Sequence, residues 1–408
     1  MRAALWIGGL GVALGVAACS GSVRSPSPSP LPSPVLGIDW GRAAPVERPA
    51  DAFAEPSTLP VPEGTGRSGH PLHYPGLAIL ADVVGLPAGG YVAVGYVYPG
   101  WHPAAWTSPD AITWSLQDMG AEEFTFPVAA VSGPDGSIVA VGRSGSDPVA
   151  WTSPDGHRWT RHEVATLSKG SVAERMTTVI ATPDGFLAGG SAGPELADRH
   201  ARFWRSADGV RWTPVPDDAD GLANAEVRSI VRVGDRYVAV GLVGSVQSIT
   251  GSVAWTSADG ETWARVDDAA LAGGRAVALT TAPFGGVVAV GSDLDRTEAV
   301  AWASADGSEW ARAPGEASRR YEGKILMTDV TVVGDQLIGV GNYIGLQRPT
   351  ASSWVSVDGV HWRRSRDAPV QEQGEFYAVI PGGPGIIAVG STGFPDDFIP
   401  VVWLSPAR

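Results

Sequence analysis

The sequence predicts an all-β fold, and three observations favour it. Gly (53) and Pro (33) are abundant and charged residues make up only 18% of the 408 residues, which suits short strands joined by turns. Runs of β-branched and aromatic residues alternate with turn residues, and no stretch shows a helical period of apolar residues. The same pattern also returns along the chain at a regular spacing, which is typical of repeat folds.

Two features define the repeat. The first is a turn between two tryptophans, as in "WTSPDGHRW" at 151–159 and "WTSADGETW" at 255–263. The tryptophans that open the units are 45 to 53 residues apart: Trp106, Trp151, Trp204, Trp255, Trp302, Trp354 and Trp403. The second feature is a strand-like run that ends in Gly, as in "YVAVG", and these glycines are Gly95, Gly142, Gly190, Gly241, Gly291, Gly341 and Gly390. Both series count seven units.

Each unit predicts four short antiparallel strands. Residues 126–164 read as "FPVAAVSG", a "PDG" turn, "SIVAVG", a loop, "PVAWTS", a second "PDG" turn and "HRWTRHEV". Four such strands repeated at this period are typical of a β-propeller blade. We therefore predict a seven-bladed β-propeller of four-stranded antiparallel blades over residues 37–408.

The last unit lacks its outermost strand, because the chain ends at "VVWLSPAR". Near the amino terminus, "LGIDWGRAAPVE" carries Trp40 followed by Val46, which resembles Trp159 followed by Val164 in "WTRHEV". We predict that residues 37–47 supply the outer strand of blade seven. This closure would remove the exposed sheet edges of an open array.

The amino terminus indicates export. Arg2 precedes an apolar run at 3–18, which is shorter than the roughly 20 residues of a spanning helix, and Cys19 is the single cysteine of the chain. The segment "VAAC" at 16–19 resembles the lipobox of bacterial lipoproteins. The resemblance implies that residues 1–18 are a signal peptide and that Cys19 is lipidated, which would hold the protein at the extracytoplasmic face of the cell membrane. The alternatives are a plain secretory peptide and a membrane anchor.

Residues 19–36 predict a stalk. The stretch "SPSPSPLPSP" alternates Ser and Pro, which favours extended polyproline II over helix or sheet. The lone cysteine leaves no internal disulfide and no cysteine-ligated zinc site.

The repeated turn predicts a structural role for its carboxylates. Asp can bond backbone amides ahead of it and Gly accepts positive φ, and the carboxylates are Asp110, Asp155, Asp208, Asp259, Asp306 and Asp358. Ala111 stands where the other turns have Gly, so we expect a strained or altered turn there. The pattern Ser-x-Asp-Gly-x-x-Trp resembles the Asp-box (BNR) repeat of sialidase-like propellers, although it is one residue shorter than the common form. Catalytic or calcium-binding carboxylates are the alternative.

The opposite face carries the first candidate site. Arg175, Arg228 and Arg275 lie near the starts of the innermost strands of three adjacent units, and Glu174, Glu226 and Glu375 are close by. The sialidase resemblance implies that three arginines grip an acidic sugar, and bidentate guanidinium forks favour this. The chain departs from that family, since it lacks a Phe-Arg-Ile-Pro segment and has seven units instead of six. No Tyr-Glu nucleophile pair follows from a motif, and Tyr321 and Tyr377 are candidates only. The alternative is a solvated ring of alternating charges.

The second candidate site is a group of aromatic and imidazole side chains in two loops. "SGHPLHYPG" and "YVYPGWHPA" should emerge on one face and bring together His70, His73, Tyr74, Trp101 and His102. Such groups can stack on a sugar ring or bind a metal, but histidines in exposed loops are commonly solvated. We predict no metal site.

The whole sequence favours a non-catalytic, membrane-anchored binding or scaffold module. Its net charge of −14 argues against a nucleic-acid partner, and it has no glycine-rich phosphate loop, so we expect no cofactor. The predicted partner is a glycan, a peptide or another protein, and the predicted state is a monomer. A sialidase-like glycoside hydrolase is the alternative.

Overall fold

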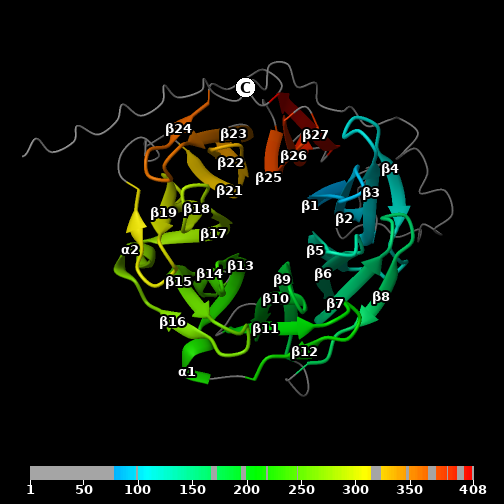
Figure 1. Ribbon diagram of the computed structural model, residues 1–408, viewed down its shortest axis with the longest axis horizontal. Helices are drawn as coiled ribbons and strands as arrows, with labels where there is room; N and C mark the ends of the chain where they lie inside the picture. The colour runs from blue at the N-terminus through cyan, green and yellow to red at the C-terminus, as the bar shows by residue number, and fades with distance from the viewer. Residues whose placement is uncertain are drawn as a thin grey trace, which may run out of the picture. The chain divides into compact units, whose positions relative to one another are not determined.

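The computed structural model describes residues 78–97, 100–166, 172–193, 199–216, 219–245, 247–313, 323–345, 349–365, 374–383, 385–392 and 399–406. Within these ranges seven antiparallel sheets stand around a central axis (Figure 1). The predicted all-β, seven-bladed propeller is therefore confirmed. Several predictions lie outside the described residues: the signal peptide, Cys19, the stalk, the strand at 37–47 with Trp40, and His70, His73, Tyr74 and Tyr321.

The first four blades follow one another along the chain. Blade one is β1 (Ala78–Gly85), β2 (Tyr91–Val97), β3 (His102–Ser108) and β4 (Ser115–Asp118). Blade two is β5 (Thr125–Ser132), β6 (Ile138–Ser144), β7 (Asp147–Ser153) and β8 (Thr160–Glu163). Blade three is β9 (Glu174–Thr182), β10 (Gly185–Ala192), β11 (His200–Ser206) and β12 (Thr213–Pro214). Blade four is β13 (Ala225–Val233), β14 (Arg236–Gly244), β15 (Ile249–Ser257) and β16 (Ala264–Val266).

Three more blades complete the ring. Blade five is β17 (Gly274–Thr281), β18 (Val287–Asp293), β19 (Ala299–Ser304) and β20 (Ala311–Arg312). Blade six is β21 (Lys324–Val333), β22 (Gln336–Ile344), β23 (Pro349–Ser356) and β24 (Arg363–Arg364). Blade seven has three strands among the described residues, β25 (Gly374–Gly382), β26 (Gly385–Thr392) and β27 (Ile399–Pro406). Two one-turn helices, α1 (Ala219–Leu222) and α2 (Ala269–Ala272), precede blades four and five.

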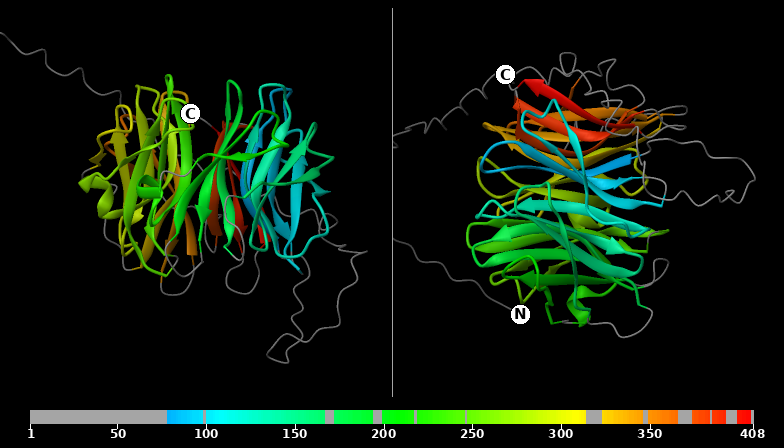
Figure 2. Two further views of the ribbon diagram at one scale, coloured as in Figure 1. Left: turned by 90° about the horizontal axis from the view of Figure 1, so that it is seen from below. Right: turned by 90° about the vertical axis from the view of Figure 1, so that its right-hand side faces the viewer.

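Within each sheet the strands pair in chain order, so the first strand of every blade lies nearest the axis and the last lies at the rim (Figure 1). The strands run along the axis from one end of the ring to the other (Figure 2). All turns between third and fourth strands therefore gather at one end. All loops between second and third strands gather at the other.

The core lies between the blades. The third strand of each blade carries the repeated tryptophan, and all seven are at most 3% exposed. Clusters mix neighbouring sheets: Val288 and Val290 of blade five pack with Ile325 and Trp354 of blade six. Burying one aromatic side chain contributes about 2 to 3 kcal/mol at a fully covered site. The repeated tryptophans thus hold adjacent sheets together.

Blade seven packs directly on blade one and closes the ring. Ile387 and Val402 of blade seven share a buried cluster with Trp106 of blade one. The backbone N–H of Gly383 donates to the Tyr91 hydroxyl at 2.6 Å, across 292 positions of the chain. The described residues close the ring through side-chain packing.

The repeated turns are built by side-chain to backbone hydrogen bonds. Asp155 Oδ1 accepts from the backbone N–H groups of His157 (2.9 Å) and Arg158 (3.1 Å), and Ser153 Oγ accepts from Gly156 (2.8 Å). The carboxylates of Asp110, Asp208, Asp259 and Asp358 accept the same two amides, and Asp306 accepts one of them. The amides of Thr262 and Glu261 lower the pKa of Asp259 to about 2. These carboxylates therefore accept hydrogen bonds from the backbone amides of their own turns, which is a structural role.

Four of these turns, at Gly156, Gly209, Gly307 and Gly359, also fit tightly against the preceding blade. Gly156 has a φ of 79°, and a Cβ there would lie 2.6 Å from Val92 Cγ2. Ala111 of blade one keeps the left-handed backbone with a φ of 63°. The expected strain at Ala111 is thus present in a turn of unchanged shape.

The innermost strand of every blade bulges opposite the repeated glycine of the adjacent second strand, the glycine that ends the "YVAVG"-like run. A Cβ on any of these seven glycines would lie 1.8 to 2.1 Å from a carbonyl oxygen of the innermost strand. One residue per blade is left outside the ladder at this bulge: Ala81, Val128, Thr177, Arg228, Val277, Thr328 and Tyr377. Because a bulge re-aims its side chain, the repeated glycine sets what faces the channel.

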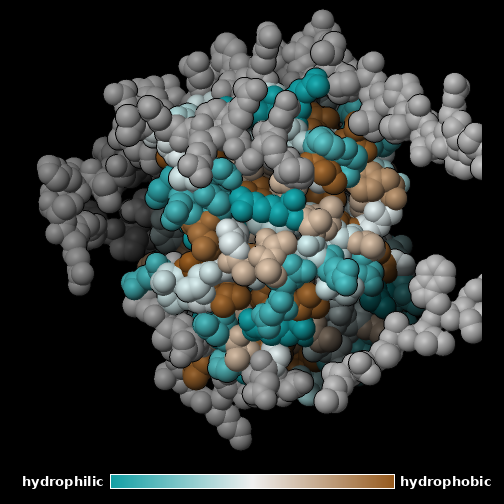
Figure 3. All heavy atoms as spheres, turned by 90° about the vertical axis from the view of Figure 1, so that its left-hand side faces the viewer, coloured by the Kyte–Doolittle hydropathy of each residue, from teal (hydrophilic) through white to brown (hydrophobic). Residues whose placement is uncertain are grey.

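The rim carries interspersed hydrophilic and apolar side chains where it is visible beside α2 (Figure 3). Neither helix in the described ranges has the length and apolarity needed to span a bilayer.

Candidate functional site

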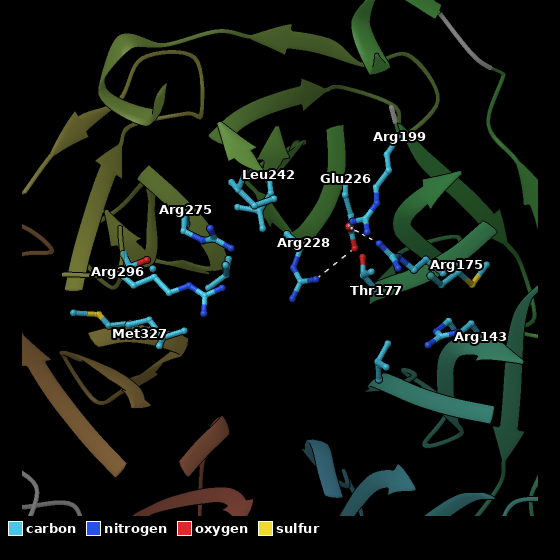
Figure 4. Close-up of a pocket in the computed structure, with 17 residues that line it drawn as sticks. Arg143, Arg175, Thr177, Arg199, Glu226, Arg228, Leu242, Arg275, Arg296 and Met327 are labelled. Carbon is cyan, nitrogen blue, oxygen red and sulfur yellow. Dashed lines mark hydrogen bonds and ion pairs between the residues drawn. The ribbon is translucent and has the colours of Figure 1, made fainter. Parts of the chain in front are cut away.

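The loops predicted to carry function lie together at the end opposite the repeated turns. Backbone hydrogen bonds join the second-to-third-strand loops of blades one to five to inter-blade connections. Examples are Phe124 N–H to Gly100 O (2.8 Å), Ala225 N–H to Arg199 O (3.0 Å) and Ile325 N–H to Arg296 O (2.6 Å). Here the channel widens into a cavity of about 530 Å³ (Figure 4). This volume suits a small-molecule ligand or a short piece of a polymer.

The three predicted arginines all line this cavity. Arg228 occupies the bulge position of blade four. Arg175 of blade three and Arg275 of blade five each stand two residues before the bulge position of their own blade. Figure 4 shows the three guanidinium groups turned into the open channel from successive blades.

The cavity is also lined by three arginines that the sequence did not predict: Arg143, Arg199 and Arg296. Arg143 directly follows the repeated glycine of blade two, and the corresponding Leu242 and Ser292 also line the cavity. The repeat could therefore have predicted that the residue after this glycine lines the cavity. Arg199 and Arg296 lie in second-to-third-strand loops. Because the lengths of these loops vary between blades, the spacing of the repeat cannot place their residues.

Glu226 is the one carboxylate among the described residues that line the cavity, and three arginines surround it. Its Oε2 accepts from Arg175 Nη2 at 2.8 Å and from Arg199, and Oε1 lies 3.4 Å from Arg228 Nη1. The Glu226 side chain is 5% exposed. Burial raises its pKa, but Arg228, Arg175 and Arg199 outweigh this and keep the pKa below its ordinary value. The Glu226 carboxylate is therefore ionised, and both of its oxygens are engaged by these three arginines.

Arg275 and Arg296 have a different environment. Neither makes an ion pair with any residue in the described part of the chain, and both are half-buried. Burial lowers the pKa of Arg275, and the like charges of Arg296 and Arg228 lower it further. Guanidinium groups gathered without a counter-charge are unfavourable, and an anion between them would remove that cost.

The predicted Tyr-Glu candidate forms a pair in blade seven. The Tyr377 hydroxyl donates to Glu375 Oε2 at 2.7 Å and also lies 2.9 Å from Ser391 Oγ. Burial and the Glu375 carboxylate raise the pKa of Tyr377 above its ordinary value. The phenol therefore stays protonated at neutral pH. Neither residue lines the arginine cavity, and Glu174, although buried, does not line it either.

Two other carboxylates stand just after bulge positions and bridge adjacent blades. Asp82 accepts from Ala130 N–H of blade two at 2.8 Å, and Asp329 accepts from Val379 N–H of blade seven at 2.8 Å. Burial raises the pKa of Asp82 to about 6 and that of Asp329 to about 7. In blade four, Ser229 Oγ accepts from Leu279 N–H at 3.1 Å in the same way.

The second predicted site is only partly described. Trp101 packs edge-on against Tyr96, with ring centroids 5.5 Å apart, and His102 begins β3. In the described ranges no three His, Cys, Asp or Glu side chains gather as metal ligands would.

No protein-family model matches the chain, and no curated protein matches it. Among solved structures, a sialidase from Trypanosoma rangeli in complex with 2,3-difluorosialic acid is 13% identical, with a TM-score of 0.47, over 71% of this chain and 55% of its own. A Bombyx mori GH32 β-fructofuranosidase is 12% identical, with a TM-score of 0.35, over 81% of this chain and 62% of its own. A Lactobacillus plantarum protein is 10% identical, with a TM-score of 0.49, over 78% of this chain and 90% of its own. This chain thus spans less than two thirds of the first two proteins, and such weak similarity says nothing about activity.

Proposed function

We propose that the chain is a binding module whose channel cavity holds the acidic group of a cell-surface glycan. The observation that supports this is the pair formed by Arg275 and Arg296, which have no carboxylate partner among the described residues. Among the described residues, six arginines and one carboxylate line this cavity, in a protein whose net charge is −14. Such a concentration of positive charge in a concave site favours a small anionic group.

The same proposal includes the membrane anchor. The lipobox-like segment at 16–19 and the Ser/Pro stretch that follows would hold the propeller outside the cytoplasmic membrane. The cavity would then face ligands of the cell envelope. Treatment of expressing cells with a signal-peptidase II inhibitor should leave the precursor uncut. The Cys19→Ala variant should carry no lipid. An unchanged, fully processed product in both cases would contradict the anchor.

Calorimetry tests the cavity. The full-length chain in detergent should bind glucuronate and not bind glucose at the same concentration. Arg275→Ala should weaken glucuronate binding at least about tenfold, because it removes a charge-assisted hydrogen bond. Arg211→Ala, at the opposite end of the ring, is the matched control and should change nothing. Equal binding of glucose and glucuronate, or equal loss in both variants, would refute the anion site.

A glycoside hydrolase is the second candidate, and the Tyr377–Glu375 hydrogen bond favours it. A retaining enzyme needs a nucleophile and an acid about 5 Å apart in one pocket. The raised pKa of Tyr377 and the engagement of Glu226 weigh against this. Turnover of a fluorogenic sialoside that Tyr377→Phe abolishes would establish the enzyme. Absence of turnover in the unmodified chain would remove it.

A further inference from the structure

An aromatic cluster lies beside the arginine cavity. The Tyr96 ring contacts Trp101 and Phe126 edge-on, with centroids 5.5 Å and 5.0 Å away. The Arg143 guanidinium lies over the Phe126 ring, 4.5 Å from its centroid. Because Arg143 also lines the cavity (Figure 4), the aromatic cluster borders the anion site through this one side chain.

The backbone that presents this cluster is strained. Trp101 has a φ of 56° and Phe124, on the adjacent inter-blade connection, has a φ of 53°. The two segments are joined by hydrogen bonds from Phe124 N–H to Gly100 O (2.8 Å) and from Thr125 N–H to Trp101 O (3.0 Å). Bulky residues rarely adopt positive φ, and each one that does so strains the backbone. Glycine would make these turns without strain, so the turns alone do not explain two aromatic residues here.

The side chains offer a surface for a ring. Trp101, Tyr96 and Phe126 are all partly exposed, and the Phe124 side chain is 56% exposed. Aromatic faces bind flat apolar surfaces such as the C–H face of a pyranose. A cation beside the rings, here Arg143, would add hydrogen bonds to hydroxyl groups at the edge of such a sugar.

The two subsites stand on different sides of the channel. Arg143 belongs to blade two, whereas Arg275 and Arg296 belong to blade five. Figure 4 shows the open channel between them. A ligand that touches both the aromatic cluster and Arg275 must therefore be longer than one sugar ring.

We propose that Tyr96, Trp101 and Phe126 form a sugar-stacking subsite, and that the ligand is an acidic oligosaccharide of at least two residues. Its acidic sugar would occupy the arginine cavity while a neighbouring sugar stacks on the aromatic cluster. This inference rests on the proposed anion site and defines its ligand class.

Two probes test it on the full-length chain in detergent: glucuronate, and the disaccharide of glucuronate and N-acetylglucosamine. The unmodified chain should bind the disaccharide about tenfold more tightly than glucuronate, the gain expected of one aromatic contact. The disaccharide should also change the tryptophan fluorescence. Trp101→Gly should abolish the tenfold gain and leave glucuronate binding unchanged.

Trp101→Gly separates a binding role from a folding role. Glycine adopts a φ of 56° without strain, which offsets part of the packing that Trp101 loses against Tyr96, so the variant should unfold cooperatively with a Tm close to that of the unmodified chain. Phe284→Ala is the matched control, because Phe284 is 50% exposed in a first-to-second-strand turn at the opposite end. It should leave the binding of both probes unchanged.

The outcomes distinguish the two proposals. If Arg275→Ala weakens glucuronate binding but the disaccharide gain persists in Trp101→Gly, the stacking subsite is refuted and the anion site stands. If neither probe binds the unmodified chain, both proposals fail. Tighter binding of uridine monophosphate than of the disaccharide would also overturn the assignment, because the cluster would then recognise a base.

Discussion

The two ends of the propeller use one backbone repeat in opposite ways. At the turn end, six blades carry the same Ser-x-Asp pattern, and the carboxylates bond the same backbone amides in blade after blade. At the channel end, the bulge is equally regular, yet the seven residues that occupy it include alanine, valine, threonine, arginine and tyrosine.

This difference separates architecture from recognition. A side chain that is the same in every blade serves what all blades share, which is their own turn. A side chain that changes while its backbone position is kept can serve a ligand that touches each blade differently. The following changes test that separation.

The largest effect is expected at the glycine behind a bulge. Gly291→Ala would place a Cβ 1.8 Å from the Arg275 carbonyl oxygen, and neither strand backbone can yield. We expect a loss of about 3 kcal/mol or more in the free energy of unfolding, measured in urea. Gly273→Ala in the same blade is the control, since nothing lies within 4 Å of its Cβ position. Comparable losses in both would mean that the bulge does not require glycine.

Glu226→Gln should give the next largest effect, because this carboxylate holds together three arginines of the channel end. The change keeps the shape but leaves three arginines without their counter-charge. We expect a loss of about 2 to 3 kcal/mol, partly restored by 50 mM phosphate, about the concentration that a weak anion site needs. A fully stable variant would show that the network is not needed for folding. A destabilised variant that phosphate does not help would show that the missing counter-charge is not the cause of the loss.

The turn end should respond in opposite directions at two equivalent positions. Gly156→Ala puts a Cβ at a φ of 79° and against Val92, so it should cost about 1 to 2 kcal/mol. Ala111→Gly relieves a φ of 63° and should change stability by less than about 1 kcal/mol, in the stabilising direction. Thermal unfolding of both variants decides this, and a destabilised Ala111→Gly would show that its buried methyl matters more than its backbone.

The smallest effect concerns pH. The pKa of Asp82 is raised to about 6 and that of Asp329 to about 7, so their contribution to stability is full below their ordinary pKa of 3.8 and is lost as the pH rises through 6 to 7. The free energy of unfolding should therefore increase by about 1 kcal/mol as the pH falls from 7 to 6.

Asp329→Ser is the variant that checks the source of this dependence. Serine at the same position of blade four accepts the equivalent amide of the next blade, so the bridge can survive without a titrating group. The pH dependence should weaken in urea unfolding of this variant. If it stays as steep as in the unmodified chain, other groups cause it.

Much of the site could be predicted because it follows the repeat. Arg175, Arg228 and Arg275 occupy related positions on the innermost strands, and the spacing of the units was enough to bring them to one channel. Arg143 was equally accessible through its place after a repeated glycine. Arg296 was not, because its loop has no counterpart of the same length in other blades, and neither was the edge-on contact between Tyr96 and Phe126, which come from different blades.

The sequence by itself determined the number of blades, the order of strands and the end at which the turns gather, because these depend on local periodicity that every unit restates. Only the tertiary structure decided which charges are paired. Whether a guanidinium meets Glu226 or stands unpaired like that of Arg275 depends on distances between blades of a few ångströms. Those distances are set by how buried tryptophans pack sheet against sheet, and residues some 50 positions apart carry no local trace of them.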